Sequence, residues 1–356
     1  MNSIFIAPEV DRNQISSEAI LHPGCQIRGA KTSIGPGCEL GAEGPLVLEN
    51  CQLARKVKLQ GGFFSGAVFL DGAYMGNGAH VRAGTILEEK ANGAHTVGLK
   101  QTILFPFVTL GSLINFCDIL LAGGTSLENC SEVGSSYIHF NFTPHQDKAT
   151  ASLLGDVSRG VLVNQNPIFL GGQGGLVGPA RINYGCVVAA GGICRNDLLD
   201  EDQLHIPATP TGKTVLFQRS VYKKLDRVVQ NNLMYLGNLR ALKAWYQQIR
   251  RRFIRDAFDQ AAHDGAIKNL DLIWNERIFQ LDKLAEKVAI SATTQPDFCM
   301  RWPAQKMALE KPADIPVAPA LGTIDSSNYL TTIQNLTPAT QLEITAWLEQ
   351  ITKEIL

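Results

Sequence analysis

The sequence lacks the features that mark membrane-spanning and secreted chains. No apolar run reaches the ~18 residues that a bilayer-spanning helix requires. The first residues, MNSIFIAPEVDRN, contain neither the basic start nor the apolar core of a signal peptide. A formal net charge of -1 over 356 residues argues against a polyanion as the general partner. We therefore expect a cytoplasmic protein with no membrane segment and no nucleic-acid partner.

Closely spaced cysteines of the CxxC type are absent as well. The eight cysteines include no CxxC pair, so neither a disulfide framework nor a zinc site is expected. The histidines show no HExxH spacing either, and we predict no metal. Four cysteines stand two residues before an aliphatic position: Cys25, Cys38, Cys51 and Cys186. We expect these four to pack as small hydrophobic side chains.

Tryptophan is absent from the first two thirds of the chain, whereas glycine is concentrated there. All four tryptophans lie after residue 240, and 29 of the 33 glycines lie in the first 200 residues. This change of composition predicts two architectures that meet near residue 210. The junction reads HIPATPTGKT, in which Pro207 and Pro210 interrupt regular structure.

Aliphatic residues recur every six positions in the first part of the chain. The recurrence is seen in three runs: Ile34, Leu40 and Leu46; Met75, Val81 and Leu87; and Leu176, Ile182 and Val188. Neither a helix, with its period of 3.6, nor a strand, with its period of 2, explains a sustained step of six. Hexapeptide repeats are typical of parallel β-helices, in which short strands stack coil upon coil. Residues 1–210 are therefore predicted to form a left-handed parallel β-helix.

The remainder of the chain is predicted to be mostly α-helical. Apolar residues recur at three and four in the segment 211–305, a Pro/Ala-rich connector occupies 306–323, and Thr337-Pro338 predicts the start of a short helix within 324–356. Between residues 213 and 255, eleven Lys or Arg face one acidic residue. We interpret this basic stretch as the solvated face of helices packed on the β-helix or on a partner subunit.

Three stretches resemble a known family. Residues 168–198, IFLGGQGGLVGPARINYGCVVAAGGICRNDL, are similar to the end of the β-helix in the bifunctional N-acetylglucosamine-1-phosphate uridyltransferase/glucosamine-1-phosphate acetyltransferases. The family's R-P-G-T and a later lysine match RAGT at Arg82 and Lys100, and its N-Y-D-G loop and trailing lysine match Asn141 and Lys148 in NFTPHQDK. The resemblance covers about residues 75–200. It implies that these four residues bind the phosphate and the sugar of the substrate.

The resemblance also implies a cofactor, an assembly and a base. Acetyl-CoA would contact the backbone around Gly172 and Ala190, and the protein would form a homotrimer. The family's catalytic histidine falls on Asp118 of this sequence. The base that takes the proton of the sugar amine would then be Asp118, His139 or His145, because histidine titrates near neutrality and a buried carboxyl can do so.

Two functions remain open at this point. The first is an acyl-CoA-dependent transferase, with acetyl as the acyl group, that acts on an amino sugar phosphate or a nucleotide sugar. The second is a catalytically inactive protein that binds or senses the same ligand on the same scaffold. Residues 1–70 contain nothing similar to the family's glycine-rich G-x-G-T-R-M nucleotide loop, so we expect no uridyltransferase activity.

Overall fold

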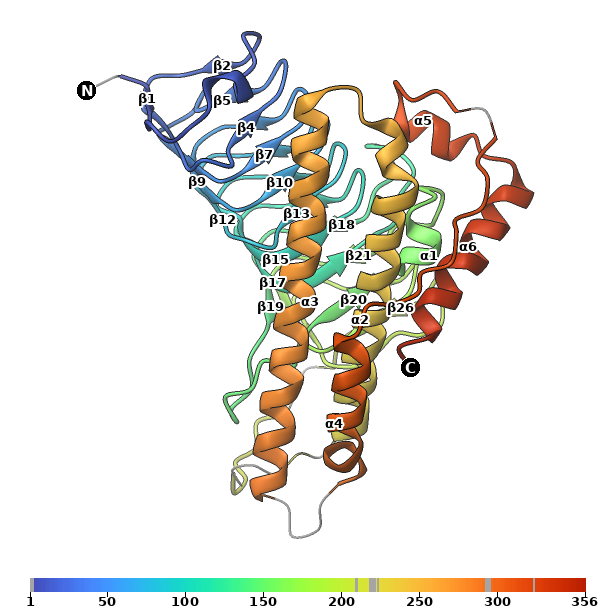
Figure 1. Cartoon of the computed structure of the whole chain (residues 1–356). Helices are drawn as coiled ribbons and strands as arrows, with labels where there is room; N and C mark the ends of the chain where they lie inside the picture. Colours follow the sequence, from blue (N-terminus) through green and yellow to red (C-terminus); the bar gives the residue numbers. More distant parts are fainter. Residues whose placement is uncertain (1–2, 209–210, 218–221, 223, 292–295, 323) are drawn as a thin grey trace.

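Residues 3–205 coil into a parallel β-solenoid, and helices from the second part of the chain cover one side of it (Figure 1). The computed structural model describes residues 3–208, 211–217, 222, 224–291, 296–322 and 324–356. All the strand pairs are parallel, and most of the strands span only two to four residues. The predicted hexapeptide-repeat β-helix is thereby confirmed as a solenoid of stacked coils.

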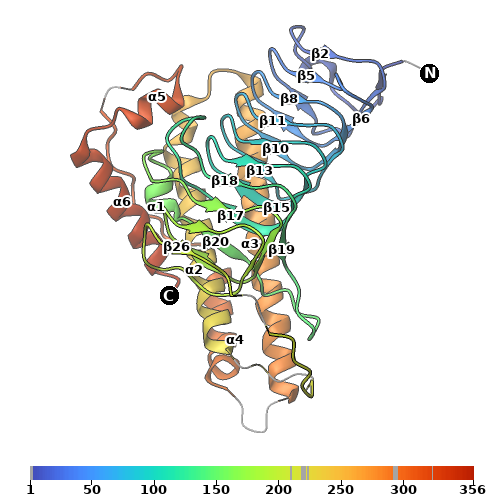
Figure 2. The same cartoon turned by 180° about the vertical axis from the view of Figure 1, so that it is seen from behind.

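One side of the solenoid is a sheet of ten strands, one from each coil (Figure 2). In stacking order these are β2 (Ile20–Leu21), β5 (Glu39–Leu40), β8 (Lys58–Leu59), β11 (Tyr74–Met75), β14 (Asn92–Gly93), β16 (Thr109–Leu110), β18 (Glu132–Val133), β21 (Phe169–Leu170), β24 (Val187–Val188) and β26 (Leu204–His205). The second residue of each strand pairs with the second residue of the next, so Leu21, Leu40 and Leu59 form a stack. Where a coil is three hexads long, as between the paired Leu170 and Val188, this register accounts for the period of six.

The other two sides belong to a single sheet of 16 strands. The first face contains β1 (Phe5–Ile6), β3 (Cys25–Arg28), β6 (Leu46–Glu49), β9 (Gly62–Ser65), β12 (Ala79–Val81), β19 (Tyr137–Phe140), β22 (Gly174–Val177) and β25 (Ile193–Cys194). The second face contains β4 (Ser33–Ile34), β7 (Gln52–Leu53), β10 (Val68–Phe69), β13 (Ile86–Leu87), β20 (Ser152–Leu154) and β23 (Arg181–Ile182). The long strands β15 (Gly98–Leu104) and β17 (Asn115–Leu121) run through the corner and join the two faces.

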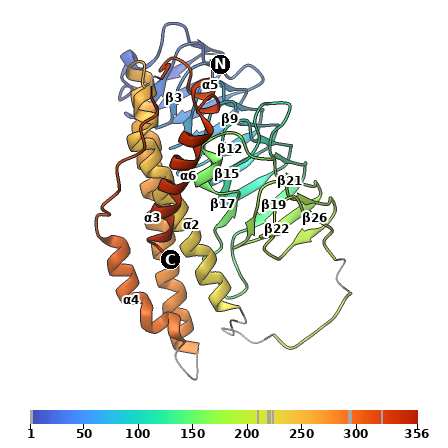
Figure 3. The same ribbon diagram turned by 90° about the vertical axis from the view of Figure 1, so that its right-hand side faces the viewer.

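Helices of the second part of the chain pack on the second face. The helical elements are η1 (Arg12–Gln14), α1 (Val157–Gly160), α2 (Leu225–Gln248), η2 (Arg250–Phe253), α3 (Ala257–Ser291), α4 (Asp297–Glu310), α5 (Tyr329–Gln334) and α6 (Pro338–Lys353). Helices α2 and α3 form an antiparallel pair beside the solenoid (Figure 3), and α3 contacts β4, β7 and β10. A Cβ at Gly265 of α3 would lie 2.2 Å from the side-chain oxygen of Gln52, so a larger residue would force the Gln52 side chain to move.

The structure confirms the predicted burial of four cysteines and the predicted start of α6, but the helical region begins later than predicted. The four cysteines that precede aliphatic positions are fully buried, and all eight cysteines are free thiols. The Thr337 hydroxyl accepts a hydrogen bond from the amide of Thr340 and caps α6, with Pro338 as its first residue. Residues 211–217, however, are exposed and have no regular secondary structure, and α2 begins at Leu225. Among the described helices, none combines the length and the apolarity that a membrane crossing requires.

Candidate ligand-binding site

The candidate site lies where β15 and β17 turn the corner between the two faces. Lys100 and Cys117 are paired in these strands, and the residues that follow them, Gln101 and Asp118, have φ values of 49° and 59°. Positive φ lets the backbone bend sharply while both strands continue onto the second face. The corner therefore presents Lys100 and Cys117 at the end of the first face.

Three cations act on the thiol of Cys117, and Arg82 contacts it. Arg82 follows β12, and its Nη2 lies 3.8 Å from the Cys117 sulfur. Burial and the charge of Asp118 raise the pKa of this thiol, whereas the positive charges of Arg82, Lys100 and Lys148 oppose that rise. Within the part of the chain that the structure describes, none of the three cations forms an ion pair. We call Arg82, Lys100 and Lys148 the cationic cluster.

The loop after β19 brings Lys148 to the cluster. It begins with the half-buried Asn141 and is closed by a hydrogen bond from the hydroxyl of Thr143 to the carboxylate of Asp147. Helix α3 holds the loop from outside, because Arg277 Nη1 donates to the carbonyl of Lys148 at 3.0 Å and Lys287 Nζ donates to the carbonyl of His145 at 3.1 Å. The loop is thereby fixed to a helix that is far away in sequence.

His139 lies inside the solenoid beside this corner. Its Nδ1 donates to the carbonyl of Cys117 at 2.5 Å, since a carbonyl can only accept, and Nε2 then accepts from the hydroxyl of Ser152 at 2.8 Å in the neutral ring. Burial is the main cause that lowers the pKa of His139 to about 4. At neutral pH the ring is therefore uncharged and both of its nitrogens are occupied by protein atoms.

Asp118 is also buried, and its partner comes from α3. Arg277 Nη2 donates to a carboxylate oxygen of Asp118 at 3.0 Å, and the exposed fractions of the two residues are 1% for Arg277 and 3% for Asp118. The carboxylate of Asp118 thus lies next to the cationic cluster, but it is paired with the guanidinium of Arg277. Its role as a base stays a prediction.

The other predicted residues lie apart from the cluster. His145 is at the tip of the loop, with its ring stacked on Phe217 at 5.5 Å and tilted against Tyr222 at 4.8 Å. Gly172 and Ala190 occupy one corner on successive coils, where the amide of Gly191 donates to the carbonyl of Gly172 at 2.9 Å. That corner precedes β22, whereas the cluster lies at the far end of the first face. The contacts of acetyl-CoA stay a prediction.

Three residues at the candidate site were not predicted from the sequence: Arg277, Cys117 and Ser152. Arg277 is 159 residues from Asp118, and in the sequence it is one of many basic residues on a helix. Cys117 and Ser152 occupy ordinary strand positions. No periodic signal marks any of the three. In the described residues, no group of three or more His, Cys, Asp or Glu side chains is placed to hold a metal ion.

Comparison with known proteins supports the resemblance in the N-terminal half. No family model matches the chain. The bifunctional protein GlmU of Trichlorobacter lovleyi is 27% identical over 198 residues, which is 55% of this chain and 38% of the relative. The GlmU proteins of Thermotoga petrophila and Thermus thermophilus are 24% and 27% identical over 52% and 51% of this chain.

These matches are partial on both sides. The matched part of the chain covers only 35 to 38% of the length of these GlmU relatives. The N-terminal half of this protein is thus a hexapeptide-repeat β-solenoid that resembles part of the bifunctional protein GlmU.

Proposed function

We propose that the cationic cluster binds the phosphate of an amino sugar phosphate or a nucleotide sugar. The observation that carries the proposal is the grouping of three cations without an ion-pair partner among the described residues: Arg82 contacts the Cys117 thiol, Lys100 is paired with Cys117 in the sheet, and the Lys148 carbonyl shares Arg277 with Asp118. Cations that have no carboxylate partner are available for charge-assisted hydrogen bonds to phosphate oxygens. Asn141, at the start of the loop, would supply a hydrogen-bond partner for the sugar.

Acetyl transfer from acetyl-CoA is the reaction that the similarity to GlmU favours. The amine of the sugar would attack the thioester carbonyl, release the thiol of CoA and lose a proton to a base. Among the three predicted bases, His139 would need Nε2 freed from the hydroxyl of Ser152, and Asp118 would need to leave Arg277. His145 is the predicted base that belongs to the loop itself.

Binding without catalysis is the second candidate, and the state of the bases favours it. His139 has both ring nitrogens bound and Asp118 is held in a buried ion pair, so neither is poised to take a proton in this structure. A scaffold that keeps its phosphate site while its base is engaged elsewhere would bind the ligand and leave it unchanged.

A trimer is proposed as the assembly. The outward positions of the first face include the exposed side chains of Phe5, Ile138 and Ile193. Apolar side chains on a flat sheet are suited to contact another copy of the chain.

The site is tested by ligand-dependent thermal unfolding. A ligand that binds only the folded protein raises the midpoint by mass action. Glucosamine 1-phosphate or UDP-N-acetylglucosamine should stabilise the wild type, and Lys100→Ala and Asn141→Ala should reduce the gain. Lys353→Ala, on the C-terminal helix, serves as the matched control and should respond like the wild type.

Acetyl-CoA separates the two candidates. Stabilisation by acetyl-CoA together with release of CoA thiol in the presence of the sugar phosphate supports transfer. Stabilisation by the sugar ligand alone supports the binding protein. The site would be wrong if no sugar ligand shifts the wild type at millimolar concentration, or if Lys100→Ala responds fully.

A further inference from the structure

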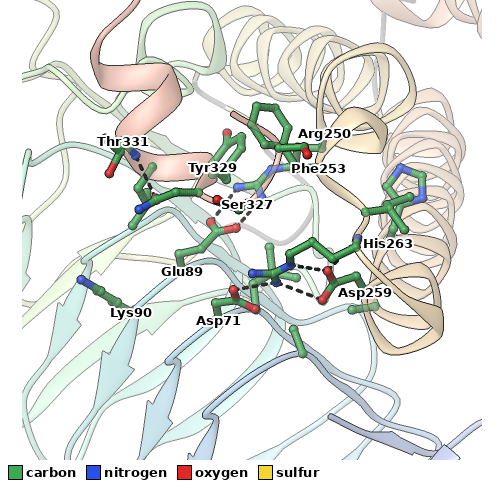
Figure 4. Close-up of a pocket in the computed structure, with 18 of the residues that line it drawn as sticks. Asp71, Glu89, Lys90, Arg250, Phe253, Asp259, His263, Ser327, Tyr329 and Thr331 are labelled. Carbon is green, nitrogen blue, oxygen red and sulfur yellow. Dashed lines mark hydrogen bonds and ion pairs between the residues drawn. The ribbon is translucent and has the colours of Figure 1, made fainter. Parts of the chain in front are cut away.

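Two pockets beside the helices differ in how their arginines are paired. The first, which we call the corner pocket, lies between the solenoid and the helices (Figure 4). Arg250 in its wall donates to Glu89 at 2.7 Å. Arg255 donates to Asp71 at 2.7 Å and to Asp259 at 2.5 Å. Because these guanidinium groups are already bound to carboxylates of the same wall, they have little left to offer a ligand.

The second pocket is a slot between α2 and α3, and residues 309–315 complete its lining. Its volume is about 450 Å³. Small-molecule sites usually occupy roughly 300 to 1,000 Å³. Leu239, Ala244 and Leu270 close the slot and are almost fully buried, whereas Trp274 and Ile315 are half-buried and leave apolar surface open to it. We call this pocket the helical slot.

Arg240 of α2 lines the helical slot without a partner for its charge. The side chain is half-buried, and its guanidinium is stacked on the ring of Trp274, 4.9 Å from the ring centre. Among the described residues, none forms an ion pair or a side-chain hydrogen bond with it. Stacking covers one face of a guanidinium and leaves the N–H donors in its plane free. These donors are therefore available to an acceptor that enters the slot.

The environment of Arg240 disfavours a charge that stays unpaired. Burial is the main cause that lowers the pKa of Arg240, and the negative charge of Glu354 opposes this effect. Glu354 is exposed at the end of α6 and makes no ion pair with Arg240. A cation that has lost part of its hydration is costly unless an anion compensates it. An anionic ligand would supply that compensation.

The carboxylates that line the helical slot do not compensate Arg240. Asp271 of α3 is bound to Lys243 of α2 at 2.5 Å. Glu310 and Lys311 are exposed neighbours of opposite charge. The lining thus contains three cations and two carboxylates, which leaves one positive charge beside apolar surface.

We propose that the helical slot binds a small organic acid with one carboxylate and an apolar body, the class that medium-chain fatty acids represent. The carboxylate accepts hydrogen bonds from Arg240, and the apolar body lies against Trp274 and Ile315. Such a ligand matches both features of the slot, since pockets commonly combine apolar walls with a few polar groups that fix the orientation of the ligand. The site is separate from the proposed sugar-phosphate site, because all of its lining belongs to the helical part.

The test is isothermal titration of the full chain with octanoate, 1-octanol and acetate. Octanoate should bind at one site per chain and about fivefold or more tighter than 1-octanol, which has a similar chain but no charge. Acetate has the charge without the apolar body and should bind more weakly than octanoate. Arg240→Met should raise the Kd of octanoate about tenfold and leave that of 1-octanol unchanged, because it removes the charged donor and keeps an apolar stem.

Folding of the variant is checked by thermal unfolding without ligand. Arg240 has no ion pair to lose, so Arg240→Met should unfold at the temperature of the wild type or above it. Arg251→Met removes an exposed arginine on η2, outside the slot, and is the matched control. It should bind octanoate with the affinity of the wild type.

Three results would overturn the proposal: no binding of octanoate to the wild type at millimolar concentration, wild-type affinity for octanoate in the folded Arg240→Met variant, or equal affinity of the wild type for octanoate and 1-octanol. Equal binding of acetate and octanoate would overturn it as well, since the apolar surface would then contribute nothing. The comparison of the three ligands uses the wild type alone, so it decides the matter even if the variant does not fold.

Discussion

Arg277 of α3 donates to Asp118 at the corner of the solenoid with an N···O distance of 3.0 Å, and both residues are almost fully buried. The same guanidinium donates to the carbonyl of Lys148, so one side chain connects the helix, the corner and the loop. The helical part therefore supports the geometry of the cationic cluster. Removing the helical part should therefore disturb the arrangement of the cationic cluster, whose three residues belong to the solenoid.

The first prediction concerns this ion pair. Arg277→Met should lower the free energy of unfolding by about 3 to 5 kcal/mol, because it leaves the carboxylate of Asp118 buried without a partner. Urea unfolding at pH 7 measures the loss. Arg251→Met, an exposed arginine on η2, is the control and should change stability little. The double variant Asp118→Asn/Arg277→Met should recover part of the loss, and failure to do so would show that packing rather than charge is responsible.

The second prediction concerns Arg250, which pairs with Glu88 and Glu89 at the corner pocket. Burial is the main cause that raises the pKa of Glu88 to about 7, and Arg250 opposes that rise. Without Arg250 the folded pKa of Glu88 moves further above its unfolded value of 4.5. An acid with a raised folded pKa loses stability as pH rises through that pKa.

Arg250→Met should therefore cost more stability at pH 8, where the variant must either keep Glu88 protonated or bury its charge unpaired, than at pH 5, where Glu88 is protonated in both folded proteins. Urea midpoints at the two pH values measure this difference, with Arg251→Met as the neighbouring control. An equal loss at both pH values would contradict the assignment of the effect to Glu88.

The period of six sufficed to predict the solenoid, because every coil buries the same positions, such as Leu40 and Leu59, on those of its neighbours. The resemblance also singled out Arg82, Lys100 and Lys148, whose positive charges act on the Cys117 thiol; their part in ligand binding stays a prediction. The contribution of the helices could not be predicted in this way. Arg277 reaches Asp118 across 159 residues, and contacts of that separation leave no periodicity in a single sequence.

The third prediction is a pH dependence due to His139. Its folded pKa of about 4 lies below the unfolded value of 6.5. The unfolded chain therefore binds the proton first, so the contribution of His139 is complete above pH 6.5 and is lost as pH falls toward 4. The loss is on the order of 3 kcal/mol. His139→Gln should remove it, and the stability difference between wild type and variant should shrink from pH 7 to pH 4. A difference that stays constant would contradict the burial of a neutral ring.

The fourth prediction concerns the thiols. Burial raises the pKa of Cys38 and of Cys51 to about 12, so neither should form the reactive thiolate near neutral pH. Cys130 is the one cysteine of the eight that is half-exposed rather than buried. Iodoacetamide at pH 8 should therefore label Cys130 first in the native protein, and all eight cysteines in urea, as read by peptide mass spectrometry. Rapid native labelling of Cys38 or Cys51 would show that the coils open.

The fifth prediction concerns assembly through the first face. Ile138 and Ile193 each pair with Gly175 of the intervening strand, so their exposed side chains flank a position that has no side chain. If this face contacts another copy, Ile138→Glu should convert a trimer to monomers, because a charge at a packed apolar contact is costly to bury. Ile20→Glu, at an exposed outward position on the ten-stranded sheet, is the control and should leave the trimer intact. Sedimentation equilibrium at micromolar concentration distinguishes the states; a monomeric wild type, or a trimer that tolerates Ile138→Glu, would contradict assembly through this face.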